Sequence, residues 1–244
     1  MAGKWESAVE NISSEIFKID THSGSGTGFV LTLNGPSANK FYGLATAYHV
    51  IGSANELELP IKLTHVQTNT SVVLKADPTT RVIIPIPDKD LAFIMFSASH
   101  FPTVIPLPQI VEQGVTKNAG LDIGWCGFPS MALSELCFFH GFISKPYKHG
   151  YLVDGVVING VSGGPAFYIQ DNQPRICGVI TEYLPNYATG QTLPGLGFIS
   201  SVEPYHQTIS ELNTFDDAER EAETQREASL SASASPSQES PEQI

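Results

Sequence analysis

Short apolar segments separated by turn residues make up most of the chain. From residue 15 to residue 201 these segments alternate with Gly, Pro, Asn and Asp. Strands of this length and spacing are typical of sandwiches and barrels rather than of alternating strand–helix units. The pattern predicts an all-β fold with strands at 15–20, 27–33, 41–46, 56–66, 71–76, 81–84, 91–96, 121–127, 135–143, 150–154, 165–170, 175–183 and 196–201.

Helical spacing of apolar residues flanks this strand-rich region. Apolar side chains recur every three or four residues in 5–12 and again in 203–212, which predicts a short helix at each place. A proline-rich stretch at 101–108 separates the strands into two groups. We therefore expect two strand-rich halves and a tail, divided as 1–110, 111–214 and 215–244.

Composition and charge exclude several kinds of partner. The chain of 244 residues is 41% hydrophobic, which is normal for a soluble globular protein. Its 25 acidic and 13 basic residues give a net charge of −12, so the phosphates of nucleic acids and anionic membranes would repel it. We therefore expect neither nucleic acid nor a membrane as a partner.

The tail differs in composition from the rest. Residues 215–244 carry eight acidic and two basic residues, which amount to half of the net charge. The charged, alanine-rich part at 216–228 predicts a nascent helix. Ser, Ala, Pro, Gln and Glu dominate 229–244, where we expect disorder because such a segment has little apolar surface to bury.

No feature of the sequence indicates a membrane segment or a metal site. It begins without an apolar leader and contains no run of about 18 apolar residues. Cys126, Cys137 and Cys177 lie at no metal-like spacing, and the histidines form no paired-ligand motif. We expect a cytoplasmic protein with reduced thiols, no metal and no organic cofactor.

Three local patterns carry the residue types of acyl-transfer chemistry. His49 closes an apolar strand, Asp90 stands immediately before another strand, and Ser162 lies in the glycine-rich turn 159–165. Each pattern alone is common in proteins without catalytic activity. Together they supply a nucleophile, a base for its proton and an acid that orients the base, in the order His, Asp, Ser. The backbone N–H groups of Gly160 and Ser162 are candidates for an oxyanion hole.

At these residues the chain resembles the chymotrypsin-like serine protease superfamily, and most closely the bacterial Deg/HtrA-type protease domain. Motifs similar to those of the family lie at 23–30, 44–50, 90–92 and 160–165. The resemblance implies two antiparallel Greek-key β-barrels with a short C-terminal helix and a disordered tail. The first barrel would supply His49 and Asp90, and the second would supply Ser162. We expect no PDZ domain after the second barrel, because few residues follow it in this sequence.

The resemblance also implies where a substrate binds. The walls of the specificity pocket would be Val156, Val157, Ile158 and Asn159 on one side and Thr181, Glu182 and Tyr183 on the other. The first wall has no acid at its base, so we expect a small or medium apolar residue, rather than Lys or Arg, before the cleaved bond. We also expect the Thr181 hydroxyl to lie within hydrogen-bond reach of Asp90, and Asp90 rather than its neighbour Asp88 to be the acid.

The sequence therefore favours a serine endopeptidase that cleaves peptides or proteins through an acyl-enzyme on Ser162. The alternative is a binding or regulatory module that has the protease fold without activity. The acidic tail is either a solvated extension or a regulatory element that tethers a partner or inhibits the cleft. A homo-oligomer is a further expectation from the resemblance.

Overall fold

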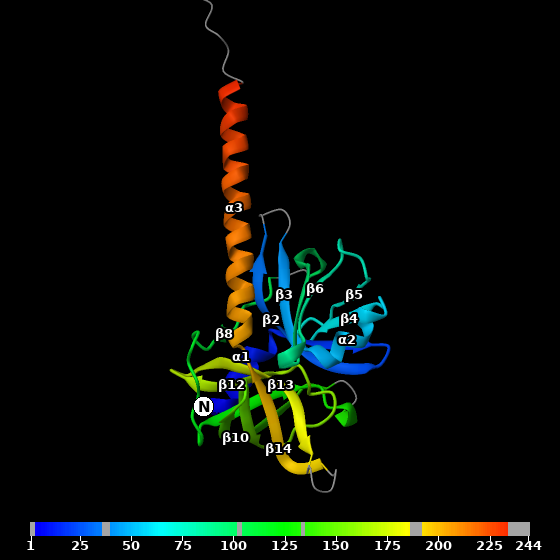
Figure 1. Cartoon of the computed structure of the whole chain (residues 1–244), viewed down its shortest axis with the longest axis vertical. Helices are drawn as coiled ribbons and strands as arrows, with labels where there is room; N and C mark the ends of the chain where they lie inside the picture. The colour runs from blue at the N-terminus through cyan, green and yellow to red at the C-terminus, as the bar shows by residue number, and fades with distance from the viewer. Residues whose placement is uncertain (1–2, 36–39, 102–103, 133–134, 186–191, 234–244) are drawn as a thin grey trace, which may run out of the picture.

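Two β-sheets, stacked one above the other in Figure 1, form the body of the protein. The computed structural model describes residues 3–35, 40–101, 104–132, 135–185 and 192–233. Each sheet has seven strands, and one long helix extends away from the body. Every strand expected from the hydrophobic pattern overlaps an observed strand, so the all-β prediction is confirmed.

The first sheet is an open, curved half-barrel of antiparallel strands. It contains β1 (Ile16–Thr21), β2 (Gly24–Asn34), β3 (Phe41–Ala47), β4 (Ile61–His65), β5 (Ser71–Leu74), β6 (Val82–Ile86) and β7 (Leu91–Ser97). Their order is β5-β4-β1-β2-β3-β7-β6, so β5 and β6 are the edges. The buried Arg81 spans the seam between these edges, because its guanidinium donates to the carbonyls of Leu59 (2.8 Å) and Leu74 (3.4 Å).

The second sheet closes on itself into a barrel of six strands. It contains β9 (Asp122–Gly127), β10 (Cys137–Tyr147), β11 (Gly150–Asp154), β12 (Pro165–Gln170), β13 (Gln173–Pro185) and β14 (Thr192–Ser201). The order is β12-β9-β10-β11-β14-β13, and the pairing of β12 with β13 completes the circle. A short strand that the sequence analysis did not predict, β8 (Gln109–Ile110), adds to β13 in parallel.

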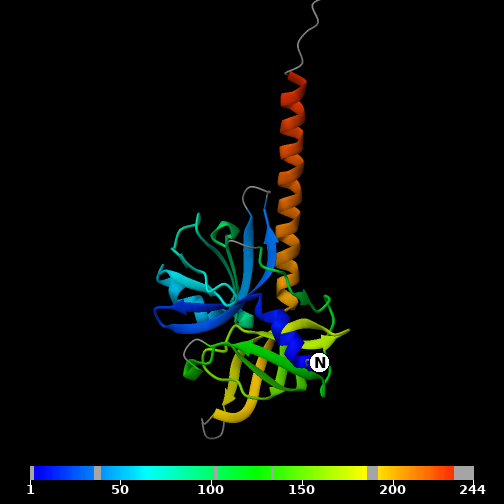
Figure 2. The same cartoon turned by 180° about the vertical axis from the view of Figure 1, so that it is seen from behind.

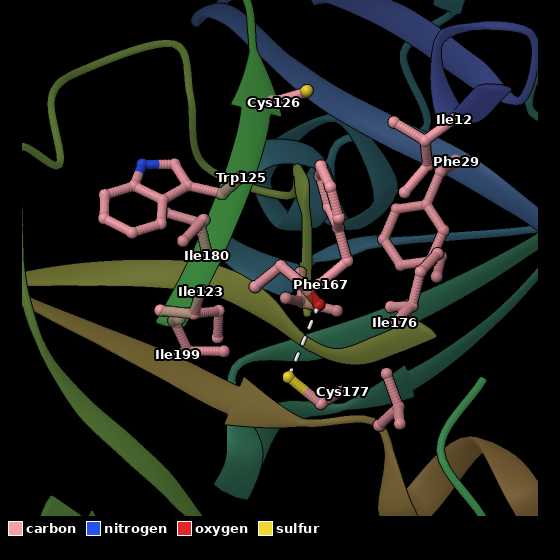
Figure 3. Close-up of a cluster of buried hydrophobic side chains, with 14 of the residues drawn as sticks. Ile12, Phe29, Ile123, Trp125, Cys126, Phe167, Ile176, Cys177, Ile180 and Ile199 are labelled. Atoms are coloured by element: carbon pink, nitrogen blue, oxygen red, sulfur yellow. Dashed lines mark hydrogen bonds between the residues drawn. The ribbon is translucent and has the colours of Figure 1, made fainter. Parts of the chain in front are cut away.

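The main hydrophobic core lies within the second barrel and reaches into the first sheet. Trp125 and Phe167 are fully buried there in one cluster with Phe29, which comes from β2 (Figure 3). Burial of a side chain of this size contributes roughly 2–3 kcal/mol of stability. Two polar groups of this core are paired, since the Trp125 indole donates to the Val156 carbonyl at 3.1 Å and the Cys177 thiol faces the Ala166 carbonyl at 3.6 Å. This shared core joins the two sheets.

Two short helices cover the sheets. The first, α1 (Lys4–Ser13), packs the ring of Trp5 against Phe138 (5.5 Å between centroids) and Phe167 (5.8 Å). It therefore covers the second barrel, although the sequence analysis groups it with the first. The second helix, α2 (Tyr48–Glu56), buries Ile51 and Ala54 against the first sheet. Single 3₁₀ turns lie at η1 (Pro87–Lys89), η2 (Ala98–His100) and η3 (Ser130–Ala132).

The C-terminal helix α3 (Glu203–Ser233) is much longer than the expected 203–212. Its first turns are anchored by the fully buried Tyr205, and Asp216 accepts a hydrogen bond from the Gly35 N–H at 2.6 Å. Beyond this point the helix continues past the body into solvent (Figures 1 and 2). It includes 229–233, where we expected disorder, and residues 234–244 lie outside the described residues. None of the described helices is long and apolar enough to cross a bilayer.

One expected strand begins too early, and the helix before it was not predicted. The hydrophobic pattern predicts a strand at 56–66, whereas β4 starts at Ile61. Residues 57–60 form a turn and irregular backbone, and Glu56 is the last residue of α2. This helix is only nine residues long and has a glycine at its centre. So short a helix owes its stability to tertiary packing and has a weak local signal.

Candidate active site

His49 and Asp90 form a close pair where β3 ends and β7 begins. The Nδ1 atom of His49 lies 2.7 Å from Oδ2 of Asp90. Half of the His49 side chain is exposed (47%), whereas Asp90 is more enclosed (23%). A carboxylate at this distance holds Nδ1 as the protonated nitrogen, which leaves Nε2 free to accept a proton. Asp88, the rival acid, is exposed and pairs instead with Lys89 at 3.2 Å.

Asp90 also caps the helix that carries His49. Ala47, the residue before α2, has no side chain that can cap it. Asp90, which directly precedes β7, caps α2 instead. Its Oδ1 accepts a hydrogen bond from the His49 N–H (2.9 Å), and its carbonyl accepts one from the Tyr48 N–H (3.0 Å). A negative charge is favourable at a helix N-terminus. One carboxylate therefore fixes both the backbone and the imidazole of His49.

Asp90 has a left-handed backbone that this double role requires. Its φ is 52° and its ψ is 41°, a region that Asp visits more readily than most residues. Its own N–H donates to the Pro87 carbonyl at 3.1 Å, which closes the turn η1. The turn thus aims the carboxylate at α2 immediately before β7 begins.

Ser162 lies in a tight turn between β11 and β12. Gly160 has a φ of +92°, and a Cβ there would lie only 2.1 Å from the Phe128 carbonyl oxygen. Only glycine fits this position. The turn is held at its far end by the Gly163 N–H, which donates to the Ile180 carbonyl at 2.7 Å.

A cleft of about 310 Å³ brings the two halves of the site together. His49 lines it from the first sheet, and Ser162, Gly160 and Asn159 line it from the second. No hydrogen bond joins His49 to Ser162, although both residues are within the described ranges. Catalytic hydrogen bonds are often long in structures without substrate, so this geometry is compatible with a nucleophile and its base. A cleft of about 360 Å³ near Lys148 contains none of these residues.

Within the described ranges, two backbone N–H groups of this turn, those of Gly160 and Ser162, have no hydrogen-bond partner. The Asn159 carbonyl accepts from the N–H (2.9 Å) and the hydroxyl (3.1 Å) of Ser130. In a trans peptide the next N–H points the opposite way, so the Gly160 N–H is directed away from Ser130. Among the described residues, neither this N–H nor that of Ser162 donates a hydrogen bond to the protein. Free donors at this position can stabilise a developing oxyanion.

The buried thiols are poor competitors for the role of nucleophile. Burial raises the pKa of Cys126 to about 12 and the pKa of Cys177 to about 12. Both groups therefore remain protonated near neutral pH, and only a thiolate is strongly nucleophilic. Within the described part of the chain, no three His, Cys, Asp or Glu side chains converge as metal ligands do.

The seven candidates for substrate binding are dispersed. Asn159 is the one that lines the cleft with His49 and Ser162. Val157 packs close to Gly197 of β14, and Ile158 is half-buried against the core. Val156 is exposed (50%), and Glu182 is exposed on β13. The backbone of Tyr183 pairs with Gly197, but its side chain lies outside the described residues.

The expected contact between Thr181 and Asp90 does not form. The Thr181 hydroxyl is buried 3.3 Å from the hydroxyl of Ser200, which in turn donates to the Lys89 carbonyl at 2.8 Å. Ser200 thus takes the position between β13 and the turn that carries Asp90. The influence of Thr181 on the acid is indirect, through the backbone of η1.

Sequence reasoning missed two residues that hold the turn, Ser130 and Thr27. Ser130 lies in η3, and its role depends on a contact with Asn159, which is 29 positions away. Thr27 lies within the matched segment 23–30, but that motif gives no sign of its partners in the second barrel. No local signal in one sequence identifies either residue.

Solved serine proteases of the Deg and HtrA types have a similar structure. A crystal structure of Deg5 superposes with a TM-score of 0.60 at 17% sequence identity, over 88% of this chain and 98% of that chain. The HtrA-type protease AlgW, solved with a decapeptide, gives a TM-score of 0.58 at 15% identity, over 86% of this chain and 67% of that one. No protein-family model and no curated protein matches the sequence. The chain therefore has the fold of the chymotrypsin-like serine proteases.

Proposed function

We propose that this protein is a serine endopeptidase that cleaves peptide bonds through an acyl-enzyme on Ser162. The observation that carries the proposal is the cleft in which Ser162 and the unpaired N–H of Gly160 meet a histidine already paired with Asp90 at 2.7 Å. Nucleophile, base, orienting acid and oxyanion donors are the parts that acyl transfer needs. The neighbouring protease structures support the same reaction class.

The first half of the reaction forms the acyl-enzyme. The Ser162 hydroxyl attacks the peptide carbonyl carbon while His49 Nε2 takes its proton. The negative oxygen of the tetrahedral intermediate accepts hydrogen bonds from the N–H groups of Gly160 and Ser162. His49 then gives its proton to the leaving amine, and the C–N bond breaks. Asp90 stabilises the imidazolium throughout.

The second half releases the acyl group. A water molecule attacks the ester carbonyl and gives a proton to His49, which returns it to the Ser162 oxygen. The products are a carboxylic acid and the free enzyme, and no cofactor enters either step.

We expect the substrate to bind as an extended strand along β13. Strand β14 pairs with one edge of β13 up to residue 185, whereas β12 pairs with the other edge only as far as Val179. The second edge at 181–183 therefore has no partner strand among the described residues and could accept a peptide by β-augmentation. The wall formed by 156–159 has no acid, which favours a small or medium apolar residue before the scissile bond.

Labelling with a fluorophosphonate probe separates the enzyme from an inactive module with the same fold. The wild type should gain one label on Ser162, while Ser162→Ala gains none and His49→Ala reacts far more slowly. Ser144→Ala is the matched control, because Ser144 is exposed on β10 outside the cleft. A wild type that stays unlabelled, or a Ser162→Ala variant that still reacts, contradicts the proposal.

A peptide library tests the substrate preference separately. Cleavage after small or medium apolar residues is the expected profile. A profile dominated by Lys or Arg would show that a negative charge lies at the base of the pocket, against the interpretation of 156–159.

A further inference from the structure

Thr27 links the first sheet to the turn that carries Ser162. It lies on β2, is fully buried, and makes four hydrogen bonds. Its N–H donates to the Ser162 carbonyl (2.8 Å), and its hydroxyl donates to the Gly160 carbonyl (2.9 Å). The same hydroxyl accepts from the Phe128 N–H (3.1 Å), and its carbonyl accepts from the Thr46 hydroxyl (2.7 Å). Every polar atom of this residue is therefore engaged.

These contacts fix the peptide units around Gly160. Glycine at a φ of +92° has no Cβ to restrict it, so its two adjacent peptide planes can rotate with little steric cost. Ser130 holds the plane before it, through the Asn159 carbonyl. Thr27 holds the plane after it, through the Gly160 carbonyl. With both planes held, the Gly160 N–H keeps one direction.

The site of the Thr27 hydroxyl is closely packed. A Cβ on Gly127 would lie 2.9 Å from Thr27 Oγ1 and 2.8 Å from the Cα of Val161. Gly127 thus lets the hydroxyl approach the turn. An apolar side chain of the same shape would leave the Gly160 carbonyl and the Phe128 N–H buried without partners.

We propose that Thr27 is a positioning residue for the turn that carries Ser162. Through Thr27, the first sheet holds the N–H groups of Gly160 and Ser162 in their reactive direction. This inference rests on the proposed serine endopeptidase activity and adds a residue to it. Thr27 touches no reacting atom. It acts through the backbone of the turn, so its loss affects the transition state more than the binding of substrate.

Three variants of the full chain test this role. Thr27→Val keeps the shape of the side chain and removes the hydroxyl, while Thr27→Ser keeps the hydroxyl. Thr32→Val is the matched control, because Thr32 is a buried threonine on the same strand whose hydroxyl bonds to Asn34, away from the cleft. The measurements are kcat and KM for a cleaved peptide, the rate of fluorophosphonate labelling, and Tm.

The expected result is a loss in kcat that the control does not share. Thr27→Val should lower kcat and the labelling rate about 10- to 100-fold, with KM within about 2-fold of the wild type, because an oxyanion donor is misplaced. Thr27→Ser should stay within about 3-fold of the wild type. Thr32→Val should lower Tm in a similar way to Thr27→Val and leave kcat unchanged well below Tm.

Two results overturn the inference. One is a Thr27→Val variant whose Tm falls while kcat and labelling stay at the wild-type level, since the residue would then be structural only. The other is a Thr27→Ser variant as slow as Thr27→Val, since the hydroxyl would then not be the group that acts.

Hydrogen exchange distinguishes failure of this inference from failure of the proposed function. If the wild type itself neither labels nor cleaves, the proposed function fails. Hydrogen exchange of the backbone amides in 158–164, measured by mass spectrometry, still tests whether Thr27 holds the turn that carries Ser162. Thr27→Val should speed that exchange at least about 10-fold relative to the wild type and to Thr32→Val. Equal exchange in all three proteins overturns the positioning role.

Discussion

The buried carboxyl of Glu15 predicts a strong dependence of stability on pH. Glu15 lies between α1 and β1, is 7% exposed, and has a buried Oε2 with no hydrogen-bond partner among the described residues. Burial raises the pKa of this group from 4.5 to about 8. The folded protein therefore keeps Glu15 protonated near neutral pH, whereas the unfolded chain does not.

Proton linkage gives the direction and the size of the change in the free energy of unfolding with pH. Below pH 4.5 both states hold the proton, and Glu15 does not favour unfolding. Between pH 4.5 and 8 only the folded state holds it, so the free energy of unfolding falls by about 1.4 kcal/mol per pH unit. The full loss is up to about 5 kcal/mol at pH 8, and it stays constant above that pH. This is a large part of the stability of an ordinary domain.

Urea denaturation of the wild type and of Glu15→Gln, from pH 5 to pH 9, measures this effect. The fluorescence of the buried Trp125 reports unfolding. The amide brings its own buried N–H groups, which shift the stability of the variant by a constant amount at all pH values. The informative quantity is therefore the difference between the two curves, which should change by several kcal/mol between pH 5 and pH 8 and then level off.

The matched control is Glu10→Gln, which makes the same change at an exposed position of α1. Parallel curves for the wild type and Glu15→Gln between pH 5 and pH 8 would falsify the reasoning, because the carboxyl would then ionise equally in both states.

Four further changes test the site and its supports. Asp90→Asn should lower kcat by about 10⁴-fold, since the amide favours the wrong tautomer of the imidazole, and kinetics on a cleaved peptide measure it. Gly160→Ala places a Cβ 2.1 Å from the Phe128 carbonyl oxygen, so probe labelling should be abolished and stability should fall by about 1–3 kcal/mol in urea. Tyr205→Phe should cost about 1–3 kcal/mol in the same assay, with packing retained. Deletion of 221–244, which keeps Asp216 and its partner Arg220, should leave Tm and labelling unchanged, and a change in either would indicate that the deleted residues contact the body.

The three candidate catalytic residues could be proposed from the sequence because each stands in a local pattern. His49 ends an apolar strand, Asp90 precedes one, and Ser162 lies in a glycine-rich turn, so a few neighbouring residues identify each of them. Their order along the chain and the family resemblance then indicated the two-sheet fold. The choice of Asp90 over Asp88 agrees with the observed contact to His49 at 2.7 Å.

The supports of these residues could not be predicted, because they join positions far apart in the chain. Asp90 caps α2 by accepting a hydrogen bond from the His49 N–H, which lies 41 positions away in the chain. Thr181 bonds to Ser200 instead of the acid, since the alternation along β13 and β14 decides which hydroxyls meet. The length of α3 was missed for another reason. Its outer part is polar on all sides, and a helix of this kind has the same composition as a disordered segment.

The geometry of the site depends on contacts between the two sheets rather than on either sheet alone. Ser200 of the second barrel donates to the Lys89 carbonyl, in the turn that aims Asp90. Tyr205 follows that barrel, and burial holds the pKa of its phenol well above the usual value, so it remains a hydrogen-bond donor to the carbonyls of Thr46 (3.1 Å) and Ala92 (3.0 Å). Thr46 in turn donates to Thr27, which holds the turn of Ser162. A chain of hydrogen bonds thus runs from the second barrel through the first sheet and back to the turn that carries Ser162. A change that weakens these hydrogen bonds should therefore lower the proposed activity even where the shared core keeps the protein folded.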